Sequence, residues 1–248
     1  MAEFFVWAHR GASGVAPENT LAAFQEALSQ GAGGIELDLH LSADGVPVVI
    51  HDETVDRTTN GKGAVGQMTS ARLRRLDAGS WFDSRFGGEK IPLLSEVLDW
   101  AGDRIRLNLE IKAFAAGTEI LRLLQDFPNV DVVVSSFQHR LLRRLRQHHA
   151  TLPLAFLTES PLWHFALWQA AQCSAQSWHP RLDRLSRGML RQAHRLGMAV
   201  YPWTVDDPAR MRSLCQMGVD GLFTNFPDAC QLCFSIPGRE TKSSGGSR

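Results

Sequence analysis

Eight short apolar or alternating runs recur along this chain, and stretches with helical spacing lie between most of them. This alternation constrains the fold more than any other feature, because strands that alternate with helices are typical of a parallel sheet covered by helices. Eight such strands in 248 residues predict an α/β fold, a (β/α)8 TIM barrel. The runs are Phe4–Ala8, Gly34–Leu39, Ile105–Ile111, Asp131–Ser135, Pro153–Leu157, Ala175–Trp178, Ala199–Trp203 and Val219–Thr224. The alternative is an open doubly wound sheet, and its dinucleotide-binding form is disfavoured because no Gly-x-Gly-x-x-Gly follows the first run.

One connection is too short for a parallel crossover. Only Ser42–Gly45 separates the extended run that ends at Leu41 from the one that begins at Val46, whereas a crossover needs about a dozen residues or more. A β-hairpin is therefore predicted after the second strand. A register that pairs Leu41 with Val46 would set Glu36 opposite His51.

The remaining segments suggest one domain with a long insertion. Residues 52–93 contain several turn signals, and an insertion of this length at a strand end is expected to cover a substrate. We expect a single barrel domain over residues 1–238. The polar, Gly- and Ser-rich residues 239–248 are expected to form a disordered tail.

Charge and hydropathy exclude several classes of partner. The 26 Lys and Arg residues balance 26 Asp and Glu residues, so no broad nucleic-acid surface is expected. No apolar run approaches the ~18 residues of a membrane span, so no integral membrane association is expected. Met1–Ala8 holds Glu3 in place of the basic region of a signal peptide, which favours a cytoplasmic location. Four cysteines are too few for a disulfide framework, and Cys230 and Cys233 are interpreted as structural.

Acidic side chains alternate with apolar ones in two of the predicted strands. Glu36 and Asp38 point away from their apolar neighbours in one strand, and Glu110 does so in the next. Buried carboxylates need a cation because burying their charge alone is too costly. An all-oxygen ligand set favours Mg²⁺ or Ca²⁺. The alternative, solvated faces of edge strands, is disfavoured by the apolar residues that occupy the opposite faces.

Further polar residues come at the ends of predicted strands, where barrel enzymes build their sites. His9 and His51 are suited to act as general acid and general base. Arg10 and Lys112 supply fixed positive charge for an anion. His179 follows the sixth strand and is a candidate for the substrate pocket. With a cation, these groups provide what hydrolysis of a phosphodiester requires.

An ordered series of motifs runs from residue 9 to about residue 225. The motifs are His9-Arg10-Gly11, Pro17-Glu18-Asn19-Thr20, Glu36-Leu37-Asp38, His51-Asp52, Asp77-Ala78-Gly79-Ser80-Trp81, Ile91-Pro92-Leu93-Leu94, Glu110-Ile111-Lys112 and Trp203-Thr204-Val205. In these motifs and their order the sequence resembles the glycerophosphodiester phosphodiesterase family, in its bacterial cytoplasmic form.

The resemblance implies a TIM barrel with an insertion after the hairpin. It implies a metal held by the three carboxylates, an acid–base pair of the two histidines, and contact of both cationic side chains with the phosphate. Trp203 would lie beside the alcohol. Glu18 and Asn19 would not contact the substrate. They would orient Arg10 and lie where the first helix begins.

The reaction that the resemblance implies is hydrolysis of small glycerophosphodiesters to sn-glycerol 3-phosphate and an alcohol. The nucleophile is either water or the glycerol 2-hydroxyl, which would give a cyclic phosphate. The predicted hairpin register favours His51 as base and His9 as acid. The sequence leaves open the alcohol, the choice between Mg²⁺ and Ca²⁺, and whether the protein is a monomer or a homodimer.

Three alternatives remain at this point. A lysophospholipase D or sphingomyelinase D-like enzyme on the same fold would need an apolar groove, which Trp81, Phe82 and Phe86 could supply. A Schiff base on Lys112 is disfavoured because the nearby acidic residues favour the protonated amine. A non-catalytic phosphate-binding barrel is disfavoured because both histidines and all three carboxylates are present.

Overall fold

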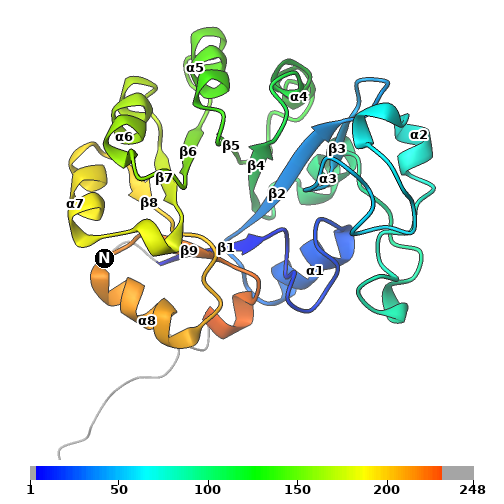
Figure 1. Cartoon of the computed structure of the whole chain (residues 1–248), viewed down its shortest axis with the longest axis horizontal. Coiled ribbons are helices and arrows are strands. Elements are labelled where there is room, and N and C mark those ends of the chain that lie inside the picture. The colour runs from blue at the N-terminus through cyan, green and yellow to red at the C-terminus, as the bar shows by residue number, and fades with distance from the viewer. Residues whose placement is uncertain (1–3, 231–248) are drawn as a thin grey trace, which may run out of the picture.

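The computed structural model, which describes residues 4–230, is a nearly closed barrel of eight parallel strands with helices on its outer side (Figure 1). The barrel strands are β1 (Phe5–His9), β2 (Gly34–Leu41), β4 (Arg106–Ile111), β5 (Val132–Ser136), β6 (Leu154–Thr158), β7 (Ser177–Pro180), β8 (Ala199–Val200) and β9 (Gly221–Thr224). Their order in the sheet is β8-β7-β6-β5-β4-β2-β1-β9. The predicted TIM barrel is therefore confirmed.

Backbone hydrogen bonds between the first and last strands of this path bring the barrel close to full closure. Asp220 N donates to Val200 O at 3.2 Å, and Phe223 N donates to Pro202 O at 3.0 Å. The strand β8 ends at Val200 rather than at Trp203 as predicted. Pro202 has no N–H to donate, which interrupts the regular ladder at this point.

Along the chain, helices alternate with the strands, and they cover the outer, apolar face of the sheet. They are α1 (Leu21–Ser29), α3 (Leu94–Ala101), α4 (Ala116–Leu124), α5 (His139–His148), α6 (Trp163–Gln172), α7 (Arg187–Arg195) and α8 (Pro208–Met217). Ile35, Leu37 and Leu39 of β2 are fully buried in the core that these helices form with the sheet. The alternation seen in the sequence therefore sends the other face of β2 into the barrel.

The hairpin is present, but its register differs from the prediction. Strand β3 (Pro47–Val49) pairs antiparallel with β2, and Leu41 is opposite Pro47. The predicted pairing of Leu41 with Val46 is therefore wrong by one residue. The Ser42 hydroxyl donates to Asp44 at 2.6 Å and accepts from Val46 N at 3.0 Å, which draws Val46 into the turn.

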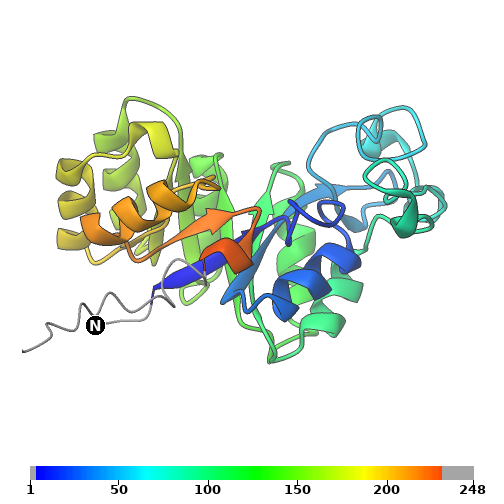
Figure 2. The ribbon, with the colours of Figure 1, turned by 90° about the horizontal axis from the view of Figure 1, so that it is seen from below.

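The insertion over residues 52–93 has its own small core. It contains α2 (Ser70–Leu73) and two short 3₁₀ helices, Val65–Gln67 and Ser84–Phe86. Its apolar residues pack in a cluster with Val48 and Ile50 of the hairpin segment. This packing fixes the chain immediately around His51. In Figures 1 and 2 the insertion lies on the opposite side of the barrel from α6 and α7.

Some sequence predictions lie outside the described residues. These are the tail over 239–248, the domain boundary at residue 238, and Cys233. Within residues 4–230, no helix is long and apolar enough to cross a membrane.

Candidate active site

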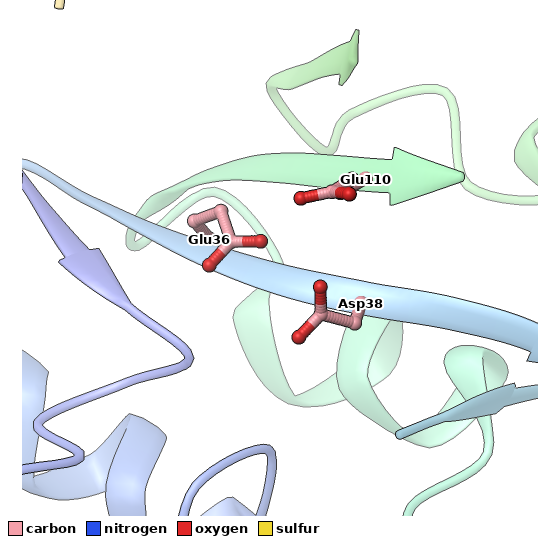
Figure 3. Close-up of side chains that lie close together, drawn as sticks. All are labelled: Glu36, Asp38 and Glu110. Atoms are coloured by element: carbon pink, nitrogen blue, oxygen red, sulfur yellow. The ribbon is translucent and has the colours of Figure 1, made fainter. Parts of the chain in front are cut away.

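Three carboxylates from two neighbouring strands meet inside the barrel (Figure 3). Asp38 on β2 is the register partner of Glu110 on β4, and Glu36 lies two residues earlier on β2. One carboxylate oxygen from each residue lies within 4.8 Å of the others. All three side chains are buried. The two strands therefore bring together the acidic set that their alternation predicted.

Residues at the start of the chain hold two of these carboxylates in place. The backbone N–H of Arg10 donates to Glu36 Oε2 at 3.0 Å, and Arg10 Nε lies 3.2 Å from Asp38 Oδ2. Asn19 Nδ2 donates to the same Asp38 oxygen at 2.8 Å, and Asn19 Oδ1 accepts from Asp38 N at 3.2 Å. Asn19 thus supports Asp38 through its side chain, and its backbone N–H donates to Arg10 O at 3.0 Å. Thr20 is the residue that caps α1.

Lys112 lies between Asp38 and the third member of the cluster, Glu110. Its ammonium group lies 2.9 Å from Asp38 Oδ1 and also contacts Glu110 Oε1. Burial acts to lower the pKa of Lys112, but Asp38 and Glu110 raise it above its ordinary value. The amine is therefore protonated, which is unsuited to Schiff-base chemistry.

Burial and the repulsion between neighbouring carboxylates oppose the ionisation of two members of the cluster, Glu36 and Glu110. Burial, followed by the charges of Asp38 and Glu110, raises the pKa of Glu36 well above its ordinary value. Burial and the charge of Asp38 raise the pKa of Glu110 to about 7. Burial would also raise the pKa of Asp38, yet Lys112 and Arg10 hold it below its ordinary value.

The cluster fits a hard divalent cation. Its donors are all carboxylate oxygens, the type that Mg²⁺ and Ca²⁺ prefer. Among the described residues, buried Glu36 Oε1 has no hydrogen-bond partner. A buried polar atom of this kind is costly unless something binds it. A cation there would satisfy this oxygen and relieve the repulsion between the carboxylates.

The turn after β1 explains the His-Arg-Gly motif. Arg10 has a φ of 56°, which aims its backbone N–H at Glu36. Gly11 has a φ of 82°, and a Cβ there would lie 2.7 Å from the backbone of Ala23. Only glycine fits this position without strain. The Arg10 side chain is further fixed by Glu18, which accepts from it at 2.9 Å.

His9 has a neutral partner that sets its tautomer. Its Nδ1 lies 2.8 Å from Asn225 Oδ1. The Asn225 amide nitrogen donates to Asp206 at 2.6 Å, so its oxygen is the atom that faces the histidine and accepts from Nδ1–H. The Nε2 atom of His9 is then free to exchange a proton. Burial, followed by the charge of Arg10, lowers the pKa of His9 to about 4.

His51 has a charged partner instead. Its Nδ1 donates to Asp52 Oδ1 at 2.7 Å. Arg57 binds the Asp52 carboxylate through Nε at 2.7 Å and holds the pKa of Asp52 at about 2, together with the hydrogen bond from His51. Arg57 also donates to Glu18 at 2.7 Å. The insertion therefore connects His51 to the residue that orients Arg10.

Both histidines and five other predicted residues line one cavity of about 230 Å³. The predicted residues in its lining are His9, Arg10, Glu36, His51, Glu110, Lys112 and Trp203. Three further predicted residues do not line the cavity but contact residues that do: Asp38, Glu18 and Asn19. Trp203 packs edge-on against Phe137, which also lines the cavity, and its Nε1 donates to His179 O at 2.8 Å.

The structure does not bring the His179 side chain to the cavity. It is fully buried, with Nε2 2.9 Å from Ser177 Oγ and the ring packed against Tyr201 and Phe223. The carbonyl oxygen of His179 accepts the hydrogen bond from Trp203, so His179 helps to position a side chain that lines the cavity. Contact between His179 and a substrate has no support in this arrangement.

Three polar residues of the cavity were not assigned a role from the sequence. Asn108 and Ser135 are fully buried and, among the described residues, their side-chain polar atoms have no hydrogen-bond partner. Glu159 follows β6 and is exposed at the rim. The signal was available, because each of these polar residues lies in or just after a predicted strand.

The insertion does not cover the cavity in the way that the sequence suggested. None of the lining residues comes from 52–93. Phe82 packs edge-on against both Trp81 and Phe86, and Trp81 Nε1 donates to Ala78 O at 2.8 Å. The insertion contributes Asp52 and Arg57 behind His51 instead.

Comparison with known proteins identifies the family. The model of the glycerophosphoryl diester phosphodiesterase family matches residues 9–229. The chain belongs to this family. A glycerophosphodiester phosphodiesterase of Caldanaerobacter subterraneus subsp. tengcongensis is 40% identical over 233 residues, which cover 90% of this chain and 94% of that protein. A Bacillus subtilis glycerophosphodiester phosphodiesterase is 34% identical, over 89% of this chain and 83% of that protein.

Solved structures agree with this membership of the glycerophosphoryl diester phosphodiesterase family. A glycerophosphodiester phosphodiesterase from Agrobacterium tumefaciens superposes with a TM-score of 0.82 at 33% identity, covering 93% of this chain and 100% of that one. An Oleispira antarctica phosphodiesterase, solved in complex with the product sn-glycerol-3-phosphate, gives a TM-score of 0.88 at 28% identity, covering 94% and 97%. The predicted family is confirmed, and the chain is an enzyme of the phosphodiesterase type.

Proposed function

We propose that this phosphodiesterase hydrolyses glycerophosphodiesters to sn-glycerol 3-phosphate and an alcohol, in a reaction that depends on a divalent cation. The observation that carries the proposal is the buried cluster of Glu36, Asp38 and Glu110 beside a cavity lined by two histidines. The product bound in the Oleispira antarctica structure supports glycerol 3-phosphate as the part of the substrate that such a site retains.

The three carboxylates would hold Mg²⁺ or Ca²⁺. When bound, the cation supplies a Lewis acid for the phosphate and offsets the charge that develops in the transition state. Arg10 and Lys112 line the same cavity and would bind the phosphate oxygens. Trp203 and Phe137 form an apolar wall that would exclude water from one side of the substrate.

The two histidines take their proposed roles from their partners. The register that favoured His51 as base is not the observed one. His9 has an amide partner and a pKa lowered to about 4, so it enters the reaction neutral and we assign it as the base. His51 has a charged partner instead, because its Nδ1 donates to the ionised Asp52 carboxylate, so we assign it as the acid.

The leaving group distinguishes these two roles. With glycerophosphocholine, either His9→Ala or His51→Ala should lower kcat by about 10²–10⁴-fold. With the p-nitrophenyl ester of glycerol 3-phosphate, the alcohol leaves without protonation. His51→Ala should then recover most of its rate, while His9→Ala should not. Recovery by His9→Ala instead would reverse the assignment, and near wild-type turnover by either variant on both substrates would remove its role.

Release of glycerol 3-phosphate from a panel of glycerophosphodiesters, before and after treatment with EDTA, tests the overall function. We expect turnover that EDTA abolishes and that Mg²⁺ or Ca²⁺ restores. Turnover that persists in EDTA would refute the metal dependence, and no release from any member of the panel would refute the substrate class. Following the reaction by time-resolved ³¹P NMR distinguishes the two routes, because attack by the glycerol 2-hydroxyl gives a transient cyclic phosphate and direct attack by water gives none.

No observation favours the lysophospholipase D-like alternative. The apolar groove that it requires is absent where the sequence suggested it, because Phe82 packs against both Trp81 and Phe86 away from the cavity lining. Lysophosphatidylcholine in the substrate panel tests this directly. The cytoplasmic location and the choice between monomer and homodimer stay predictions, which cell fractionation and light scattering check.

A further inference from the structure

Charge is divided unevenly along the barrel. Residues 137–200, which contain α5, α6 and α7, hold nine arginines, no lysine and two carboxylates. With neutral histidines this segment carries a net charge of +7, so the rest of the balanced chain carries −7. Eight of the nine arginines are exposed: Arg140, Arg143, Arg144, Arg181, Arg184, Arg187, Arg191 and Arg195.

Most of these exposed arginines have no carboxylate to neutralise them. Within residues 4–230, Arg181 lies 2.9 Å and Arg184 lies 4.0 Å from a carboxylate, and both share Asp183. The remaining six have no carboxylate within 4.0 Å in that part of the chain. An uncompensated cluster of this kind attracts an anionic surface.

An apolar stripe lies among these arginines. Leu162, Phe165 and Trp168 are 72%, 58% and 55% exposed, more than any other large apolar residue in the described part of the chain. The Phe165 and Trp168 rings stack with centroids 5.7 Å apart. Ala166 and Leu167 on the other side of α6 are buried. The stripe is therefore not needed for the core of the barrel.

The fold flanks this stripe with positive charge on both sides. Helix α6 lies between α5 and α7 in Figure 1, as the order β5-β6-β7 in the sheet requires. Leu162 follows the cavity residue Glu159 by three positions, so the stripe begins on the cavity side of the barrel. Figure 2 shows α6 and α7 on the side opposite the insertion.

We propose that the outer surface of α5, α6 and α7, here called the α5–α7 face, binds peripherally to anionic lipid bilayers. Leu162, Phe165 and Trp168 insert at the level of the headgroups, and the arginines on either side bind lipid phosphates. Aromatic and leucine side chains beside basic residues are typical of surfaces that bind membranes in this way. The docking does not depend on which phosphodiester the enzyme hydrolyses.

Charge complementarity favours this occupant over the two obvious others. A two-fold contact with a second copy would bring two strongly positive faces together, which like-charge repulsion opposes. A single-stranded nucleic acid would be bound by bases stacking on rings in a groove. Leu162 has no ring on which a base could stack, and the stripe lies along one side of a helix rather than in a groove. These features disfavour a single-stranded nucleic acid.

Co-sedimentation with phosphatidylcholine vesicles, with and without about 30% phosphatidylserine, tests the proposal. The wild type should bind the phosphatidylserine vesicles at about 0.05 M NaCl and dissociate at about 0.5 M, where the charges are screened. The double variants Phe165→Ser/Trp168→Ser and Arg143→Gln/Arg191→Gln should each bind about tenfold less tightly or worse. Thermal unfolding confirms that each variant is folded.

Two matched controls keep the test specific. Trp81→Ser removes an exposed apolar side chain of the insertion, and Arg72→Gln/Arg75→Gln removes the same charge from α2 and the turn that follows it. Both should bind like the wild type.

Three results would overturn the proposal. The first is no binding of the wild type to phosphatidylserine vesicles at low salt. The second is a dimer that Phe165→Ser/Trp168→Ser converts to a monomer in light scattering. The third is displacement from vesicles by single-stranded DNA at concentrations where the DNA binds the same face.

Discussion

Replacing the buried His179 with glutamine is expected to reduce the loss of stability that the protein suffers in mild acid. Burial, followed by the charge of Arg106, lowers the pKa of His179 from 6.5 to about 3. The unfolded chain therefore takes up a proton below pH 6.5 that the folded chain does not. Linkage then requires that the free energy of unfolding decreases as the pH falls from about 6.5 to about 3.

The size of the effect follows from the width of this pH window. One pKa unit corresponds to about 1.36 kcal/mol. Between pH 6.5 and pH 4.5 the wild type should therefore lose about 2–3 kcal/mol more unfolding free energy than His179→Gln. At pH 7.5 glutamine should cost stability, because it loses the packing of the imidazole against Tyr201 and Phe223.

Urea unfolding at a series of pH values measures this difference. Phe223→Leu is the matched control, because it disturbs the same packing and leaves the imidazole in place. Its unfolding free energy should be lower than that of the wild type by a constant amount at every pH. Parallel curves for the wild type and His179→Gln would refute the reasoning, since they would mean that His179 is protonated in the folded protein.

Three further substitutions test the supports of the site. Asp52→Asn removes the negative charge that accepts the hydrogen bond from His51. It should lower kcat about tenfold or more, because a hydrogen bond to a charged group contributes about 1.5–3 kcal/mol. An unchanged kcat would show that Asp52 does not act on His51. Asn225→Leu removes the oxygen that accepts a hydrogen bond from His9, and it should slow hydrolysis of both glycerophosphocholine and the p-nitrophenyl ester. A loss of rate limited to glycerophosphocholine would contradict a role for Asn225 in supporting the base. Gly11→Ala should lower the free energy of unfolding measured in urea by about 2 kcal/mol or more, and by more than Gly45→Ala does. Both glycines have a positive φ, but only a Cβ at Gly11 would clash with backbone atoms. Equal effects of the two substitutions would mean that the backbone does not pack tightly against Gly11.

The sequence predicted the parts of the site that depend on strand period and strand order. Glu36, Asp38 and Glu110 converge because their alternation in two neighbouring parallel strands leaves no other face for the carboxylates. The same logic brought His9 and Lys112 to the cavity, since both lie at the ends of strands. The alternation within each strand and the order of the strands are enough to predict such contacts.

The details that the sequence did not predict are ones that no periodicity encodes. The hairpin register changed by one residue because the Ser42 hydroxyl draws Val46 into the turn. His179 lies at a strand end like the catalytic candidates, but its side chain turns into the barrel below Trp203. The pairing of Arg57 with Glu18 joins residues 39 positions apart through an irregular loop, and only the packed insertion shows it.

The most direct test of the account is calorimetric titration of EDTA-treated protein with Ca²⁺ and with Mg²⁺. We expect one binding site, which is lost in Glu36→Gln and Glu110→Gln and retained in the control Glu119→Gln on α4. The same two variants should lose release of glycerol 3-phosphate, and the control should keep it. Full turnover in EDTA, together with no detectable binding of either cation by the wild type, would mean that the three carboxylates do not form a metal site.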